Sequence, residues 1–170
     1  MIKKISKTNK KVTLEYHYET SFYYDVSITD HGFNWQIKSF IEPVHKTFTD
    51  ELFATYIEDP VVFTYEVDWK NVGFIEGSIQ SWNQTYRIWN FLVLDEYQNQ
   101  GIGRALMEES IKHAKNLSCR AVMLEVQSCN YPAIQFYLKQ GFKFTGLDTL
   151  AYSNEDIEKK EVRLEMGMMI

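Results

Sequence analysis

Cysteine is scarce in this chain. The 170 residues include only Cys119 and Cys129, which lie ten positions apart. Neither a disulfide framework nor a CxxC redox or metal motif can be built from that pair. The four histidines are scattered without the short spacings of zinc ligands, so we expect no metal site.

Long apolar runs are also missing. No stretch approaches the roughly 18 residues that a membrane-spanning helix needs. The lysine-rich start leads into alternating polar residues rather than the apolar core of a signal peptide, so we expect a cytoplasmic protein with no membrane partner. The N-terminal lysines are expected to form a solvated, mobile tail; they are Lys3, Lys4, Lys7, Lys10 and Lys11.

Positive charge is outnumbered in the sequence as a whole. Eighteen lysines and arginines stand against 23 aspartates and glutamates, which gives a formal net charge of -5 at pH 7. Nucleic-acid binding depends on clustered Lys and Arg, so this balance disfavours a nucleic-acid partner and fits a cationic substrate better. The length allows a substantial single core and is short for two ordinary domains.

Strand patterns dominate the first half of the chain. Aromatic and β-branched residues over 12–28 predict one or two strands, and residues 48–57 are predicted as a short helix. Strands are also predicted over residues 61–67, 72–81 and 86–94. Their short polar links predict an antiparallel meander.

The pattern then changes to helix. Apolar residues on one broad face predict a helix over 102–116, followed by a buried strand over 121–126. A second helix is predicted over 132–140, and final strands over 142–152 and 162–168.

The most informative segment joins the predicted strand that ends at Leu94 to the helix over 102–116. Its sequence is VLDEYQNQGIG, residues 93–103, with glycines at 101 and 103. Unpaired backbone N–H groups and the positive end of the helix dipole converge at such a helix start, so an anion such as a pyrophosphate can bind there. Side chains at the two glycine positions would block the close approach.

Two nucleotide-binding motifs fail on these residues. A P-loop requires Lys and then Ser or Thr after its last glycine, where this chain has Arg104 and Ala105. The dinucleotide fingerprint requires Gly or Ala at position 106, which is Leu106 here. On the loop alone, a plain strand–turn–helix connection without a ligand stays open.

The segment QNQGIG, residues 98–103, resembles the signature of the GNAT acetyltransferase superfamily: Gln or Arg, two residues, Gly, one residue, then Gly or Ala. A second group of residues has the order and spacing that the superfamily shows: Leu124, Glu125, Val126, Asn130, Ala133, Phe136, Tyr137, Gly141 and Phe142. The resemblance covers roughly residues 61–142. It implies an α/β (α+β) fold with a mixed, mostly antiparallel sheet of about seven strands, flanked by helices and splayed at the acetyl-CoA site.

The resemblance also implies an acyltransferase that uses acetyl-CoA as its cofactor. The loop would hold the phosphates, and backbone groups near two strand residues would pair with the pantetheine arm like an added strand. The residues expected to bind acetyl-CoA are Leu92, Val93, Gln98, Asn99, Gln100, Gly101, Ile102, Gly103, Arg104 and Asn130.

Two residues match catalytic positions of the superfamily. Tyr137 corresponds to the tyrosine that protonates the departing thiolate, although an aromatic packed beside Phe136 is the alternative. Glu125 lies in an otherwise apolar strand and matches a proposed general base; the alternative is a strand-end Glu paired with Lys or Arg. If Glu125 is turned away, a water relayed by Asn90 or a backbone carbonyl would have to accept the amine proton.

The acceptor is suggested by a narrower resemblance. The stretch GLDTLAYSN, residues 146–154, with Gln127 and the long N-terminal extension, resembles streptothricin acetyltransferases, which acetylate the β-lysine arm of an antibiotic. The acidic pair that such enzymes carry on the strand before the loop is Trp89 and Asn90 here. Candidate residues for a small cationic amine are Trp35, Glu42, Trp89, Asn90, Asp148 and Tyr152. Peptide N-termini or lysine side chains are the alternative acceptors, and a non-catalytic acyl-CoA sensor is the alternative function.

We expect one domain over residues 1–170. It would comprise an N-terminal extension over about 1–60, a cofactor-binding core over about 61–142, and C-terminal strands over 143–170. Exposed C-terminal strands often form homodimers, so a homodimer is the expected assembly.

Overall fold

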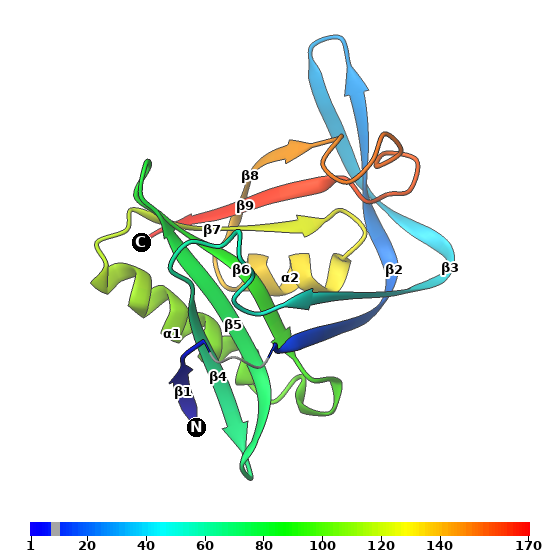
Figure 1. Cartoon of the computed structure of the whole chain (residues 1–170). Helices are drawn as coiled ribbons and strands as arrows, with labels where there is room; N and C mark the ends of the chain where they lie inside the picture. The colour runs from blue at the N-terminus through cyan, green and yellow to red at the C-terminus, as the bar shows by residue number, and fades with distance from the viewer. Residues whose placement is uncertain (8–10) are drawn as a thin grey trace. The chain divides into compact units, whose positions relative to one another are not determined.

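The computed structural model describes residues 1–7 and 11–170. Its elements in chain order are β1 Ile2–Ile5, β2 Thr13–Thr29, β3 Gly32–Glu51, β4 Val61–Val67, β5 Lys70–Gln80, β6 Thr85–Val93, the 3-10 turn η1 Asp95–Tyr97, α1 Ile102–Asn116, β7 Ala121–Gln127, α2 Tyr131–Lys139, β8 Lys143–Asp148 and β9 Arg163–Met169 (Figure 1). Seven strands form a mixed sheet in the order β1-β4-β5-β6-β7-β9-β8, and β2 pairs with β3.

The chain divides into two compact units. The first comprises Met1–Tyr16, Phe48–Leu124 and Met168–Ile170, and the second comprises His17–Thr47 and Glu125–Gly167. The predicted cofactor loop therefore belongs to the first unit, whereas Glu125, Asn130 and Tyr137 belong to the second.

An antiparallel meander of β4, β5 and β6 forms the centre of the first unit (Figure 1). The β4–β5 turn places Asp68 and Trp69 at φ 46° and 65°, the left-handed pair that a tight hairpin turn requires. Helix α1 packs against all three strands. A Cβ atom at Gly73 would lie 2.9 Å from Leu106 Cδ1, so the glycine lets the helix approach the sheet closely.

The opposite face of this meander carries its own apolar cluster. Its buried members come from four segments: Leu14, Leu52, Val62, Phe74 and Leu92. The start of β2 and the residues after β3 thus cover the face of the meander that α1 leaves open, because successive strand residues point to opposite faces.

Parallel pairing between β6 and β7 is short. It joins Thr85 to Ala121, Tyr86 to Val122 and Arg87 to Met123. Strand β6 continues for six residues beyond Arg87, directly toward the loop that precedes α1.

The second unit is built around a long hairpin of β2 and β3, which turns at residues 30–31 (Figure 1). Tyr24 of β2 packs against the rings of Tyr131 on α2 and Phe144 on β8. Strands β8 and β9 pair antiparallel. Ser128, just after β7, accepts a hydrogen bond from the Tyr24 N–H and donates one to the Val162 carbonyl.

The mixed, largely antiparallel sheet and both predicted helices are confirmed, with shifts of one or two residues at their ends. The helix predicted over 48–57 is wrong. Strand β3 runs to Glu51, and Phe53 then adopts a left-handed φ of 60°, which interrupts any helix. The last part of the strand predicted over 142–152 is also wrong, because Asp148 and Asp156 side chains accept hydrogen bonds from the Leu150 and Tyr152 N–H groups.

The mobile lysine tail is a third wrong prediction. Lys3 and Lys4 lie in β1, which pairs antiparallel with β4, and Lys3 forms an ion pair with Glu66 at 2.7 Å. Lys11 pairs with Glu51 at 3.0 Å. Lys10 lies outside the described residues. No helix within residues 1–7 and 11–170 is long and apolar enough to cross a membrane.

Candidate active site

The loop between β6 and α1 is fastened by its own side chains. Gln98 donates from Nε2 to the Val93 carbonyl at 3.1 Å and to Asp95 Oδ1 at 2.9 Å. Gln100 donates to the Glu96 carbonyl at 3.0 Å. These bonds fix the turn at the end of β6, so the first glutamine of the predicted signature has an intramolecular role.

The start of α1 has the geometry of an anion site. Gly101 caps the helix at φ 83°, and its carbonyl accepts the first intrahelical bond, from the Ala105 N–H. The N–H groups of the first helical turn precede that bond, so they lack partners within the helix. A Cβ atom at Gly101 would meet no heavy atom within 4 Å, which means that the space beside this turn is open. A diphosphate fits these backbone donors and the positive end of a 15-residue helix.

Leu92 and Val93 form the end of β6. They pair with Phe74 and Gly73 of β5 along one edge of the strand. The Leu92 side chain is buried in the apolar cluster, so only its backbone is available to a ligand. The Val93 carbonyl is occupied by Gln98.

Trp89 and Asn90 occupy an irregular part of β6. The β5–β6 register pairs Gly77 with Ile88 but Glu76 with Asn90, so Trp89 is the extra residue of a β-bulge. The indole of Trp89 donates to Ser78 Oγ at 2.9 Å.

Asn90 is buried and hydrogen-bonded through both ends of its amide. Its Nδ2 donates to Glu76 Oε2 at 2.8 Å, and its Oδ1 accepts from the Tyr16 hydroxyl at 2.8 Å. The sequence suggested that Asn90 could relay a proton through a water. An Asn with both ends of its amide already bonded is poorly suited to that role. Burial raises the pKa of Glu76, while the donors from Asn90 and Phe53 act in the opposite direction.

Tyr137, in the second unit, is buried on α2 with its ring against Phe136 and Phe142. Burial raises the pKa of its hydroxyl, because the phenolate would lose hydration. The hydroxyl therefore keeps its proton throughout the neutral range, as a general acid must.

Asn130 is the N-cap of α2. Its Oδ1 accepts a hydrogen bond from the Ala133 N–H at 3.2 Å, and the proline that follows at position 132 suits the first helical turn. This local role explains why Asn occurs at the position that the resemblance assigns to the cofactor.

Glu125 forms an ion pair that the sequence left open. Its Oε2 lies 2.9 Å from an Nη atom of Arg163 on β9, and the same guanidinium contacts Glu165 at 2.5 Å. Two carboxylates thus share one arginine in the second unit. The pairing agrees with the alternative stated for Glu125, and Arg163 is a residue that sequence reasoning missed.

The remaining acceptor candidates are spread over the second unit. Trp35 packs against Phe144 with ring centroids 4.5 Å apart and lines a shallow hollow with Asp25. Glu42 and Asp148 are exposed. The pKa of Tyr152 is raised, mainly by burial and then by the charge of Glu125, so Tyr152 belongs with the Glu125–Arg163 group.

A comparison with known protein families matches most of the chain. Residues 23–142 match the acetyltransferase (GNAT) family, which is more than half of the chain. The chain belongs to the GNAT family. It is therefore an acyltransferase, and acetyl-CoA is its cofactor.

Individual GNAT relatives match about three quarters or more of the chain. A streptothricin acetyltransferase of Streptomyces lavendulae is 29% identical over 147 residues, which cover 82% of this chain and 78% of the relative. A spermine/spermidine N(1)-acetyltransferase of Bacillus subtilis (strain 168) is 30% identical over 131 residues, covering 73% and 83%. The crystal structure of a nourseothricin acetyltransferase superposes with a TM-score of 0.78 and 26% identity, covering 94% and 98%.

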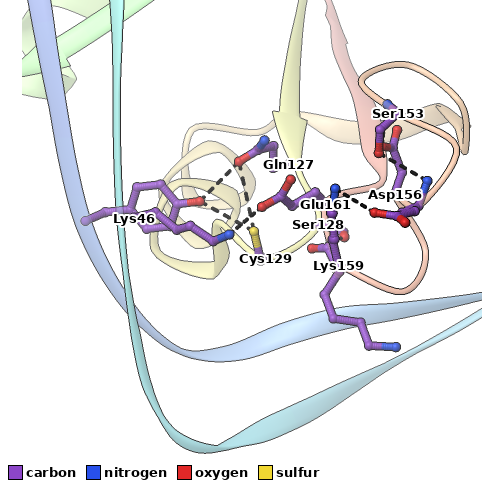
Figure 2. Close-up of polar contacts among 11 residues, drawn as sticks. Lys46, Gln127, Ser128, Cys129, Ser153, Asp156, Lys159 and Glu161 are labelled. Atoms are coloured by element: carbon purple, nitrogen blue, oxygen red, sulfur yellow. Dashed lines mark hydrogen bonds and ion pairs between the residues drawn. The ribbon is translucent and has the colours of Figure 1, made fainter.

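Two polar groups brace the second unit of this GNAT chain (Figure 2). Lys46 forms an ion pair with Glu161 beside Gln127 and Cys129, and the Tyr18 hydroxyl contacts Cys129 Sγ at 3.4 Å. Burial raises the pKa of the Cys129 thiol, so this thiol is not poised as a nucleophile. Within the described residues, no group of three or more His, Cys, Asp or Glu side chains could hold a metal ion.

The second group closes the loop between β8 and β9 (Figure 2). Buried Asp156 accepts hydrogen bonds from the N–H groups of Tyr152 and Ser153 and from the Ser153 hydroxyl, at 2.7 to 2.9 Å. Burial alone would raise the pKa of Asp156, but these donors lower it overall.

Asp156→Ala is expected to lower the thermal midpoint by roughly 5–10 °C at pH 7, because three hydrogen bonds to a buried carboxylate are lost. The pKa of Asp156 is lower in the folded protein than its ordinary value. The stabilisation by the Asp156 carboxylate is therefore present above the ordinary Asp pKa and disappears as the pH falls. Thermal unfolding of Asp156→Ala, wild type and the exposed-loop control Glu158→Ala should therefore show a lower thermal midpoint for Asp156→Ala alone at pH 7, and this difference should narrow as the pH falls below about 4. A difference that stays constant with pH would contradict this role.

Proposed function

We propose that this GNAT chain transfers the acetyl group of acetyl-CoA directly to a primary amine of a small cationic substrate, with streptothricin as the first candidate. The main support for this acceptor is the match to the nourseothricin acetyltransferase structure, which covers 94% of this chain at 26% identity. The structural match therefore extends beyond the family match at residues 23–142 on both sides, toward the N-terminus and toward the C-terminus. Segments outside a shared core are where acceptor specificity varies between enzymes of one fold.

The donor side of the proposed site is the end of β6 with the start of α1. Acetyl-CoA supplies an activated thioester, and the backbone amides at the start of α1 would bind its diphosphate. The residues proposed to hold it are Leu92, Val93, Gln98, Asn99, Gln100, Gly101, Ile102, Gly103, Arg104 and Asn130. Gln98 and Asn130 would contribute chiefly by shaping the loop and the α2 terminus, because each already makes intramolecular bonds.

Two side chains would handle the protons. Tyr137 would donate its hydroxyl proton to the departing sulfur, a role that its burial supports by keeping it protonated. Glu125 would accept a proton from the substrate ammonium, and the neutral amine would then attack the thioester carbonyl, with Arg163 fixing the orientation of the Glu125 carboxylate. Both residues lie in the second unit, and the family match at residues 23–142 draws on both units. We therefore propose that the two units act as one domain.

The charge distribution supports a cationic acceptor. The formal net charge is -5, and the second unit groups Glu125 and Glu165 around a single arginine near Tyr152. Carboxylates attract an ammonium group, and an aromatic face binds it. The other proposed acceptor contacts are Trp35, Glu42, Trp89 and Asp148. Asn90, which the sequence also suggested, is buried and bonded at both ends of its amide, so it supports the strand and does not contact the acceptor.

A polyamine is the second candidate acceptor. The specific observation in its favour is the 30% identity to a spermine/spermidine N(1)-acetyltransferase over 131 residues. Both candidates are small polycations, so the same acidic surroundings would suit either one.

The discriminating experiment is free-thiol release from acetyl-CoA over a panel of streptothricin, spermidine, a peptide with a free N-terminus and a lysine-containing peptide. We expect the highest kcat/KM on streptothricin, with spermidine next and the peptides lowest. Highest efficiency on a peptide would overturn the small-amine proposal. A chain that binds acetyl-CoA but releases no thiol with any acceptor would favour the non-catalytic sensor.

A further inference from the structure

A carboxylate outside the proposed proton transfers lies in the interior of the first unit. Glu76 of β5 has no exposed surface and adjoins Phe74 and Ile75, which are also buried. A buried carboxylate is costly unless hydrogen-bond donors surround it. Glu76 has two such donors: the Phe53 N–H lies 2.7 Å from Oε1, and Asn90 Nδ2 lies 2.8 Å from Oε2.

The hydrogen-bonded group continues beyond Glu76. Asn90 Oδ1 accepts from the Tyr16 hydroxyl at 2.8 Å. The Tyr16 ring stacks on Phe48, with centroids 4.5 Å apart and planes 4° from parallel. We call Glu76, Asn90, Tyr16 and Phe53 the Glu76 network. It joins β5 and β6 to the start of β2 and to the segment that follows β3.

One member of the Glu76 network adopts a costly backbone conformation. Phe53 has φ 60°, which is unfavourable for a residue with a side chain, and its N–H points to the Glu76 carboxylate. Three residues later, Tyr56 packs its ring edge-on against Trp89, with centroids 6.0 Å apart. The carboxylate thus holds the segment that rests on the β6 bulge.

The bulge lies where the donor and the amine would meet. The phosphate loop directly follows β6, so a donor extended from the loop along this strand would pass Val93 and Leu92 before it reaches Asn90 and Trp89. The attacking amine must reach the acyl carbon at that end of the donor. We propose that Glu76 is a positioning residue that shapes the acceptor side of β6 by holding Asn90 and Phe53. This inference rests on the proposed function.

The Glu76 network can be rewired with its hydrogen bonds intact. Glu76→Gln places an amide donor opposite the Asn90 amide donor, so one bond is lost unless the Asn90 side chain flips. Asn90→Asp places a second carboxylate beside Glu76, which like charges disfavour. The double variant Glu76→Gln/Asn90→Asp restores complementarity, because the amide at 76 accepts from Phe53 and donates to the carboxylate at 90. That carboxylate also accepts from Tyr16.

The test measures KM for the amine, KM for acetyl-CoA and kcat in wild type, both single variants and the double variant. We expect Glu76→Gln to raise the amine KM by about tenfold and to change the acetyl-CoA KM by less than about twofold. The double variant should recover most of the loss. Thr64→Val is the matched control, because it removes a hydrogen bond from another buried polar side chain of the same sheet, to the Gly73 carbonyl. It should leave both KM values unchanged.

The outcomes separate this inference from the proposed function. If wild type turns over the amine while Glu76→Gln keeps the same amine KM, the positioning role is overturned. If Glu76→Gln raises both KM values equally and Thr64→Val does the same, Glu76 contributes only to general stability. That result would also overturn the positioning role. If Glu76→Gln fails to fold, the double variant decides: a wild-type amine KM supports the rewired network, and a raised one contradicts it. A wild type inactive on every amine rejects the proposed function itself.

Discussion

Tyr137→Phe is expected to lower kcat by about 100-fold while the Kd for acetyl-CoA stays within about twofold of wild type. The change removes only the hydroxyl from a buried ring whose packing against Phe136 and Phe142 persists. Proton donation to the departing sulfur matters in the transition state and not in the bound ground state. Steady-state kinetics and calorimetric titration with acetyl-CoA separate the two quantities.

The pH dependence gives the same prediction a second test. Because burial raises the pKa of Tyr137, the wild-type kcat should show no alkaline fall from this group up to about pH 10. Tyr131→Phe removes a hydroxyl from the same helix and should leave kcat unchanged. Retention of near-normal kcat by Tyr137→Phe would show that the leaving thiolate gains its proton from elsewhere.

Gly101→Val is expected to raise the Kd for acetyl-CoA by about tenfold or more, because a β-branched residue disfavours a φ of 83° by more than 1–2 kcal/mol. No side chain obstructs a Cβ at this position, so the effect must come from the backbone. Relief of that strain would turn the first amides of α1 away from a common anion. Isothermal titration with acetyl-CoA measures the effect.

The matched control for this prediction is Gly146→Val. Gly146 lies in β8, and a Cβ there would make ordinary contact with Glu165 at 3.9 Å. That variant should bind acetyl-CoA like wild type. If Gly101→Val also binds normally, the left-handed turn at the start of α1 is not the phosphate site.

Local patterns in the sequence were sufficient for the core of the fold. The change from alternating strands to a helical period near Gly101 places the β6–α1 loop, because both signals depend on neighbouring residues. The β4–β5–β6 meander follows from short polar links in the same way. Neither prediction depends on what lies far away in the chain.

Distant partners account for what was missed. The helix predicted over 48–57 fails because the Phe53 N–H bonds to Glu76, 23 residues away, rather than to a neighbouring turn. Tyr16 and Asn90 meet across 74 residues. A signal for Glu76 was nevertheless present in the sequence. Glu76 is the one carboxylate in the apolar stretch of β5, and the same kind of observation selected Glu125 in β7.

The candidate site residues were selected by their spacing along the chain, which says nothing about their distant contacts. The burial of Tyr137 and the open start of α1 are compatible with the roles that the resemblance implies, and those roles stay predictions. The partner of Glu125 could not be read from the sequence, because Arg163 follows it by 38 positions and meets it only through the tertiary fold.

Amine-dependent acetyl transfer can be measured as the rate of free-thiol release from saturating acetyl-CoA with and without streptothricin. We expect a rate that depends on the amine, saturates with it and falls by about 100-fold in Tyr137→Phe. A rate that is the same with streptothricin, spermidine or no amine, by a chain that still binds acetyl-CoA, would contradict amine-dependent transfer.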